Sequence, residues 1–286
     1  MTAMTTMGIA PTSPSQVRHR RLHRFRWALS DGVTVVRRDL GHVRHAPAEL
    51  IATLLFPIIM IIVFGYTFGS AIAVPGGGNY REYLMPGLFV LTQVTAFGTL
   101  ALAVADDAAK GVMDRFRSMP MSRLAVPFGR TGADIITGTL ALTGMVVCGF
   151  AVGWRIRNGF ADAVAGFALL ILFRYSLSWF GAFLGMLVKN PKTADALMPL
   201  TFPITMLANT FVPTTGMPLW MQHVANWNPV SCTVAASRQL FGNPSYTTPH
   251  PAWPMAHPIL ASASWSVLLL VVFIPLTTWR FARAKG

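Results

Sequence analysis

Residues 84–105 read LMPGLFVLTQVTAFGTLALAVA, a stretch without a charged side chain. A helix of about 20 predominantly apolar residues is long enough to cross the hydrocarbon core of a bilayer. Comparable apolar stretches recur along the chain, and each predicts a transmembrane helix. The predicted spans cover residues 49–69, 84–105, 133–153, 161–188, 196–212 and 259–279. The fifth is short and contains two prolines, so we expect it to be kinked.

The composition excludes an ordinary soluble domain. Hydrophobic residues make up 53% of the 286 residues and charged residues only 12%, and the mean hydropathy is +0.51. Soluble domains usually carry about 25% charged residues. So many apolar side chains need lipid as their solvent, and the chain is predicted to be an all-α integral membrane protein with six spans.

The formal charge of +13 predicts an orientation. If the N-terminus lies inside, 18 of the 23 Lys and Arg residues fall in internal segments and four in external ones. Loops on the cytoplasmic side are enriched in Lys and Arg, so both termini are predicted to be cytoplasmic and the chain to be multi-pass in a bacterial plasma membrane. The positive charge therefore needs no nucleic acid, and no basic-aromatic motif points to one.

The region before the first span divides into two predicted parts. Residues 1–23 are predicted to be a disordered cytoplasmic tail, and the first long apolar run begins too late for a cleavable signal. Residues 24–46 mix apolar side chains with Arg and Asp, which predicts an amphipathic helix on the inner membrane surface. A basic segment without fixed structure is the alternative. Residues 47–286 form the predicted six-span domain.

The segment between spans five and six is rich in proline and tryptophan. Short helices are predicted within residues 219–240, dipping into the outer leaflet as re-entrant helices. Trp220 suits the boundary between membrane and water, and Asn228-Pro229 is a turn or helix-start signal.

The predicted internal loop after span two combines charge with an apolar edge. Met113, Phe116 and Met119 recur at a spacing of three, in a short amphipathic helix that ends at Pro120. Such a helix, held between two spans, could transmit a push from a cytoplasmic partner into the membrane. A solvated charged loop is the alternative.

Two motifs resemble a known family. The loop RFRSMPMSRL (115–124) and the external segment MPLWMQHVANWNPVS (217–231), with Arg238 after it, are similar to the membrane subunits of ABC type-2 exporters, in particular the daunorubicin/doxorubicin-resistance-type permeases. The resemblance implies two six-span permease subunits, identical or paralogous, each standing on a separate cytoplasmic ABC ATPase. It makes residues 24–45 the connecting helix and spans two and five the walls of the translocation route. The residues implied to contact the ATPase are Asp114, Arg115, Phe116, Arg117, Ser118, Met119 and Pro120.

Energy for export would come from that partner chain. The sequence contains no Gly-x-x-x-x-Gly-Lys-Ser/Thr phosphate loop, so we expect no ATPase activity from this chain itself. ATP and Mg²⁺ would bind the partner, and this chain is expected to hold no cofactor. The three external histidines match no zinc-binding spacing, and no metal site is predicted.

Polar, aromatic and methionine side chains on spans two and five suit a route for an amphipathic organic molecule, although hydrogen bonding between helices is the alternative for each. The candidate route residues are Gln93, Thr95, Phe97, Thr99, Thr201, Met206, Asn209, Thr210 and Phe211.

Arg174 lies in mid-span, where a charge is costly and suggests function. Because Asp106, Asp107 and Asp134 are predicted to lie near the inner face, we expect Arg174 to pair with carbonyls or to reach toward the membrane surface.

Other functions are possible from the sequence. A polysaccharide or lipid-carrier exporter differs from a drug exporter only in its route. An ion-coupled secondary transporter needs carboxylates in mid-span, and none is predicted there. A membrane enzyme needs paired catalytic groups at one depth.

Three Gly-x-x-x-Gly pairs, among them Gly181/Gly185, are expected to pack helices within the chain.

Overall fold

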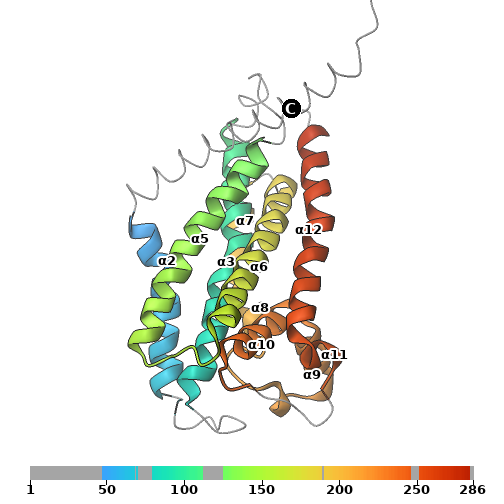
Figure 1. Cartoon of the computed structure of the whole chain (residues 1–286). Helices are drawn as coiled ribbons and strands as arrows, with labels where there is room; N and C mark the ends of the chain where they lie inside the picture. Colours follow the sequence, from blue (N-terminus) through green and yellow to red (C-terminus); the bar gives the residue numbers. More distant parts are fainter. Residues whose placement is uncertain are drawn as a thin grey trace, which may run out of the picture.

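The computed structural model describes residues 47–67, 69, 79–111, 125–188, 190–245 and 251–283 (Figure 1). Within these ranges the regular structure is helical, without a strand. Four of the described helices are long and apolar enough to cross a membrane. They are α3 (Tyr80–Ala109), α5 (Ala125–Ala151), α6 (Phe160–Val188) and α12 (Pro258–Arg283). They correspond to predicted spans two, three, four and six, which confirms an all-helical membrane protein.

Helix α3 is the central element of the bundle (Figure 1), and most of its side chains are buried. It packs most extensively on α6. A Cβ added to Gly181 of α6 would lie 2.3 Å from the carbonyl oxygen of Phe97. A Cβ added to Gly185 would lie 2.5 Å from the carbonyl oxygen of Ala101. The two backbones touch because glycine removes the side chain between them, so this Gly-x-x-x-Gly pair packs helices within the chain as expected.

The first predicted span is helical, but the winding of the helix changes in its last turn. It consists of α2 (Pro47–Ile62) and one turn of π-helix, η1 (Val63–Thr67). Leu55, Phe56 and Ile62 of α2 expose large hydrophobic side chains. Their exposure is compatible with a lipid-facing helix, while crossing of the membrane by this segment stays a prediction.

The fifth predicted span is not a continuous helix. The chain forms α7 (Pro191–Asp195), the 3₁₀ turn η2 (Met198–Leu200) and α8 (Thr201–Met206), and turns follow. Pro199 and Pro203 lack the N–H groups that would continue a helix, which explains the interruptions. The prediction of one kinked span over residues 196–212 was therefore wrong, and the count of six spans stays a prediction.

Short helices do occur between this segment and α12, as predicted. The 3₁₀ turn η3 (Thr214–Gly216), α9 (Leu219–Trp227), α10 (Pro229–Phe241) and α11 (Trp253–Ala256) gather near the first residues of α12 (Figure 1). We call this the re-entrant end of the molecule, after the prediction that these helices dip into the outer leaflet, which stays a prediction. Helix α10 is almost wholly buried and packs on α6 and α12.

The start and the end of α10 follow from local chemistry. The side chain of Asn228 accepts a hydrogen bond from the Val230 N–H at 2.9 Å, and Pro229 occupies the first turn. Gly242 ends the helix with a φ of 69°, a left-handed conformation that glycine adopts without strain. The Asn-Pro helix-start signal is thus confirmed.

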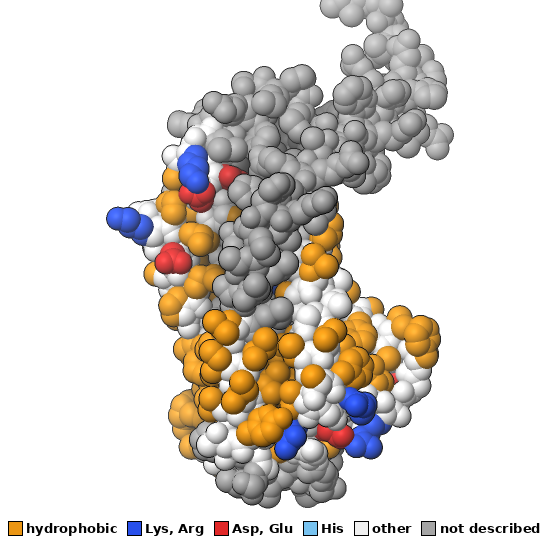
Figure 2. All heavy atoms as spheres, turned by 90° about the vertical axis from the view of Figure 1, so that its left-hand side faces the viewer, with side chains coloured by type: hydrophobic (Ala, Val, Ile, Leu, Met, Phe, Trp, Pro, Cys, Tyr) orange, Lys and Arg blue, Asp and Glu red, His pale blue; other side chains and the backbone are white. Residues whose placement is uncertain are grey.

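The surface has the pattern of a protein that lies in lipid. Figure 2 shows hydrophobic side chains over the middle of one face and charged side chains toward its two ends. Large exposed hydrophobic side chains also follow α12, including Leu260, Val267 and Val271. An apolar surface of this extent needs lipid or another protein against it.

The contact between α3 and α6 leads to a first prediction. A Gly181→Ala substitution would place a methyl group against the Phe97 carbonyl and is expected to destabilise the fold by about 1–3 kcal/mol. Thermal unfolding of the purified protein in mild detergent measures the effect. Gly216→Ala is the control, because a Cβ there meets nothing within 4 Å. An unchanged melting temperature for Gly181→Ala would contradict such close packing.

Candidate functional site

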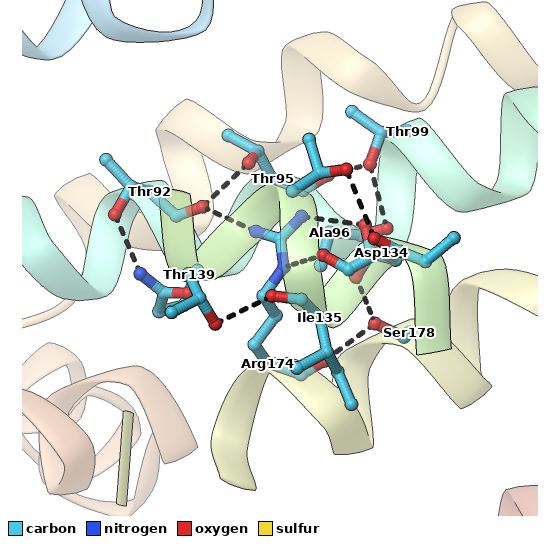
Figure 3. A network of polar contacts seen from close by, with 12 residues as sticks. Thr92, Thr95, Ala96, Thr99, Asp134, Ile135, Thr139, Arg174 and Ser178 are labelled. Atoms are coloured by element: carbon cyan, nitrogen blue, oxygen red, sulfur yellow. Dashed lines mark hydrogen bonds and ion pairs between the residues drawn. The ribbon is translucent and has the colours of Figure 1, made fainter. Parts of the chain in front are cut away.

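A buried ion pair joins the three central helices (Figure 3). Arg174 of α6 is 5% exposed, and its Nη2 lies 2.7 Å from the Oδ1 of Asp134 on α5. Its Nε donates to the Asp134 carbonyl at 3.1 Å, and its Nη1 donates to the Thr92 carbonyl of α3 at 3.2 Å. The charge of the arginine is therefore neutralised by one carboxylate and satisfied by two carbonyls.

The expectation that no carboxylate reaches Arg174 was wrong. The third span was predicted to begin at residue 133, which placed Asp134 near the inner face. Helix α5 begins at Ala125 instead. At 1.5 Å per residue, Asp134 lies about 14 Å inside the helix, deep enough to meet the arginine. The expected pairing with carbonyls is confirmed, but it accompanies the carboxylate and does not replace it.

Two small residues fit the ion pair into the bundle. The hydroxyl of Ser178 donates to the second carboxylate oxygen of Asp134 and also to the Arg174 carbonyl, the latter at 3.0 Å. Gly138 leaves space for the guanidinium, because a Cβ there would lie 1.8 Å from the Arg174 Nε. Breaking one side of a buried, hydrogen-bonded pair leaves an uncompensated charge, so each partner stabilises the other.

Two further ion pairs lie near the ends of α3. Asp107 pairs with Arg130 of α5, and both side chains are mostly buried. At the other end, Glu82 accepts two hydrogen bonds from Arg157, at 2.7 and 3.0 Å. These hydrogen bonds and the charge of Glu82 raise the pKa of Arg157 above its ordinary value, so the guanidinium stays charged at every physiological pH. Sequence spacing gave no signal for either pair.

The re-entrant end contains a second buried arginine. Arg238 of α10 is 1% exposed, and its Nε donates to the Tyr83 carbonyl at 2.9 Å. Its Nη2 donates to the carbonyls of Asn209 and Thr210, at 2.9 and 3.1 Å. The guanidinium carbon lies 3.5 Å from the centre of the Tyr83 ring, in cation–π contact. In the sequence analysis Arg238 entered only through the resemblance, and its role in binding carbonyls was missed.

These contacts satisfy carbonyls that the broken fifth segment leaves unpaired. The hydroxyl of Tyr80 donates to the Phe211 carbonyl at 2.8 Å, and that of Tyr83 to the Asn209 carbonyl at 3.2 Å. Non-helical backbone at membrane depth is tolerated where protein groups bond to it. One turn of α3 and one arginine thus hold the chain at residues 207–212.

The candidate route residues divide into two groups. The structure buries Gln93, Phe97, Asn209, Thr210 and Phe211. Thr99 and Met206 are exposed, and Thr95 and Thr201 are half-buried.

The exposed candidates belong to two segments in contact. A Cβ added to Gly98 would lie 2.4 Å from the sulfur of Met198, so α3 and η2 touch beside Thr99 and Thr201. Together Thr95, Thr99, Thr201 and Met206 are called the α3–α8 strip below. Only this part of the predicted route reaches the surface of the chain.

The polar residues of α3 bond mainly to their own helix. The hydroxyls of Thr92, Thr95 and Thr99 donate to carbonyls three or four residues earlier (Figure 3). The amide nitrogen of Gln93 donates to the Phe89 carbonyl at 3.2 Å, while its Oε1 is buried without a partner among the described residues. The alternative weighed for each residue was hydrogen bonding between helices; the three threonines of α3 instead bond to carbonyls of their own helix.

The remaining predicted site residues either lie outside the described residues or belong to the short helices α9 and α10. The loop from Asp114 to Pro120 and the predicted helix at 24–46 lie outside the described residues. Trp220 is 67% exposed on α9, while Asn228 and Pro229 form the turn between α9 and α10. Among the described side chains, no cluster of three or more His, Cys, Asp or Glu could hold a metal ion.

Comparison with known proteins shows a match to one protein family and similarity to individual permeases. Residues 32–241 match the family described as ABC-2 type transporter. The chain is 32% identical to the daunorubicin resistance ABC transporter permease protein DrrB1 of Streptomyces coeruleorubidus, over 87% of this chain and 85% of that protein. It is 30% identical to the doxorubicin resistance ABC transporter permease protein DrrB of Mycobacterium tuberculosis, over 82% of this chain and 83% of that protein.

The central ion pair leads to a second prediction. Asp134→Asn leaves the buried guanidinium of Arg174 without a counter-ion and is expected to destabilise the fold by about 3–5 kcal/mol. The double variant Asp134→Asn/Arg174→Gln is expected to lose less than the sum of its single variants. Thermal unfolding in detergent measures all three.

Asp106→Asn is the matched control. It removes the exposed partner of Lys110, a surface pair expected to contribute no more than about 1 kcal/mol. Strict additivity of Asp134→Asn and Arg174→Gln would mean that the two charges do not interact.

Proposed function

This chain belongs to the ABC-2 type transporter family and is a membrane permease subunit of an ABC exporter, and we propose that it moves amphipathic, partly aromatic compounds out of a bacterial cell. The observation that carries this proposal is the similarity, over more than four-fifths of the chain, to two permeases named for resistance to daunorubicin and doxorubicin. The compound class comes from those names and from the side chains on the α3–α8 strip.

A separate chain supplies the energy in this proposal. The absence of a phosphate loop from the sequence supports an ATPase partner that carries ATP and Mg²⁺. That ATPase contacts residues 114–120, in the loop that follows α3. A second permease, identical or paralogous, completes the transporter, with both termini of each permease in the cytoplasm and six spans in each.

The substrate route follows the α3–α8 strip in this proposal. Threonine hydroxyls and a methionine lie there beside the exposed leucines and isoleucines of the fifth segment, such as Leu200 and Ile204. A surface that mixes hydroxyl, thioether and aliphatic groups suits an amphipathic molecule. Two copies of the strip, facing each other across a permease pair, would enclose the route.

In this proposal, helix α3 transmits the movement of the ATPase to the substrate route. Residues 112–124 follow this helix directly. Its ion pair with α5 and the hydrogen bond from Arg174 of α6 to its Thr92 carbonyl tie it to two neighbours. A displacement of the loop by the ATPase would therefore move α3, α5 and α6 as one unit against the fifth segment.

The competing functions differ in what they require. A secondary transporter needs a carboxylate that binds and releases an ion, and Asp134 lies at a suitable depth. Both of its oxygens are already bonded, one to Arg174 and one to Ser178, which supports a structural role. A polysaccharide or lipid-carrier exporter remains the alternative within the family.

Transport by cells that express the chain with its neighbouring ATPase tests the proposal. Efflux of a fluorescent anthracycline is expected to stop when ATP is depleted and to continue when ion gradients are collapsed. Efflux that survives ATP depletion but fails without an ion gradient would assign the chain to secondary transport. ATP-dependent export of a lipid-linked saccharide without anthracycline efflux would favour the alternative exporter.

The proposed ATPase contact gives a third prediction. Arg115→Glu and Phe116→Ala are expected to reduce the ATPase recovered with the purified permease by at least about tenfold, since hot-spot residues contribute about 2 kcal/mol or more. Arg155→Glu is the charge-reversal control, because Arg155 is exposed in the loop between α5 and α6 at the opposite end of the bundle. If the same amount of ATPase were recovered with all three variants, the ATPase would contact a different part of the permease.

A further inference from the structure

A cavity opens at the re-entrant end, between α3, the fifth segment and helices α9 to α11. Its volume is about 430 Å³. Polar groups from several elements line it, among them Arg238, Asn209, His223 and Thr214. Leu219 and Met255 give it an apolar wall. The cavity can therefore hold a group that is polar at one end and apolar at the other.

The charge balance of this cavity favours an anion. Arg238 bonds to three carbonyls through Nε and Nη2, but carbonyls carry no net charge to compensate the guanidinium. Its remaining nitrogen, Nη1, makes no hydrogen bond with the described residues. No Asp or Glu is among the described residues that line the cavity. A buried arginine without a carboxylate partner is an attractive site for a negatively charged oxygen.

Asn209 provides a second, independent observation. Its side chain is 9% exposed and lines the cavity, and its Oδ1 has no partner among the described residues. Its Nδ2 makes only a weak contact with the Met255 sulfur, at 3.9 Å. A buried amide usually has stronger partners, so its Nδ2 is available to donate to a negatively charged oxygen in the cavity, while its Oδ1 accepts and calls for a hydroxyl on the same ligand.

The neighbouring surface indicates what the anion is attached to. Trp220, Val224 and Trp227 lie on one face of α9 at helical spacing, and all three are exposed. Tryptophan on an exposed amphipathic helix is typical of the boundary between membrane and water. A ligand that enters beside α9 would therefore have its headgroup in the cavity and its acyl chains against these side chains.

We propose that this cavity binds the phosphate headgroup of an anionic phospholipid from the adjacent leaflet. Arg238 neutralises the phosphate, the Nδ2 of Asn209 donates a hydrogen bond to it, and the apolar face of α9 contacts the acyl chains. The bound lipid then holds the fifth segment and α10 together, because Arg238 and Asn209 belong to these two elements. This inference requires that the chain lie in a membrane but not that any particular compound be exported.

Lipid-dependent stabilisation of the purified full-length chain tests the proposal. Short-chain phosphatidylglycerol is expected to raise the melting temperature in detergent at concentrations at least about tenfold lower than phosphatidylcholine of the same chain length. Inorganic phosphate at matched concentration is expected to have no such effect. Equal effects of the two lipids, or full protection by inorganic phosphate, would overturn the proposal; the second result would identify a site for free anions.

Two nearly isosteric variants test whether phosphatidylglycerol stabilises the chain by binding in this cavity. Asn209→Asp adds a negative charge within the cavity and is expected to weaken the response to phosphatidylglycerol by at least about tenfold. Gln239→Glu adds the same charge on the exposed face of α10 and is expected to leave the response unchanged. An undiminished response in Asn209→Asp would overturn the proposal. This variant leaves the carbonyl bonds of Arg238 in place, so it does not depend on a well-folded Arg238 variant.

Discussion

The ion pair between Arg174 and Asp134 determines how the central helices can be arranged. A charge within an apolar bundle costs several kcal/mol unless a partner of opposite sign and hydrogen bonds compensate it. That requirement fixes the register of α6 against α5, since the guanidinium lies against Gly138, where a Cβ would collide with it. It also brings α3 into the same layer, because the Thr92 carbonyl accepts the third hydrogen bond of the arginine. Three helices are held by one charged side chain.

The same rule explains the fifth segment, where backbone carbonyls take the place of the carboxylate. Helix α8 ends at Met206, and the turns that follow leave the carbonyls of residues 209–211 without partners in a helix. Tyr80, Tyr83 and Arg238 donate to them. The irregular backbone at residues 207–212 therefore depends on donors from α3 and α10. Those donors bring a positive charge to this end of the molecule, and the cavity beside it remains without a carboxylate among the residues described.

Sequence reasoning predicted the apolar elements better than the charged contacts. The long apolar runs predicted α3, α6 and α12, and Asn228-Pro229 predicted the start of α10, because hydropathy and capping are local properties. Asp134 was misplaced because a charged residue was taken as the edge of an apolar run, although a partner on another helix allows it inside. The pairs of Glu82 with Arg157 and of Asp107 with Arg130 join distant residues, and no local pattern signals them. The break in the fifth span was underestimated because two prolines were expected to kink a helix that they interrupt.

The distribution of these contacts indicates how the two ends of the molecule can communicate. Helix α3 runs from the re-entrant end to the loop at residues 112–124, and ion pairs at both of its ends and the contact of Arg174 with its middle join it to its neighbours. An element held at three levels moves as a rigid body more readily than it bends. The fifth segment is instead a chain of short turns, held to α3 by glycine contacts and carbonyl hydrogen bonds. Relative movement is therefore expected between these two elements, which is where the α3–α8 strip and the Arg238 cavity both lie.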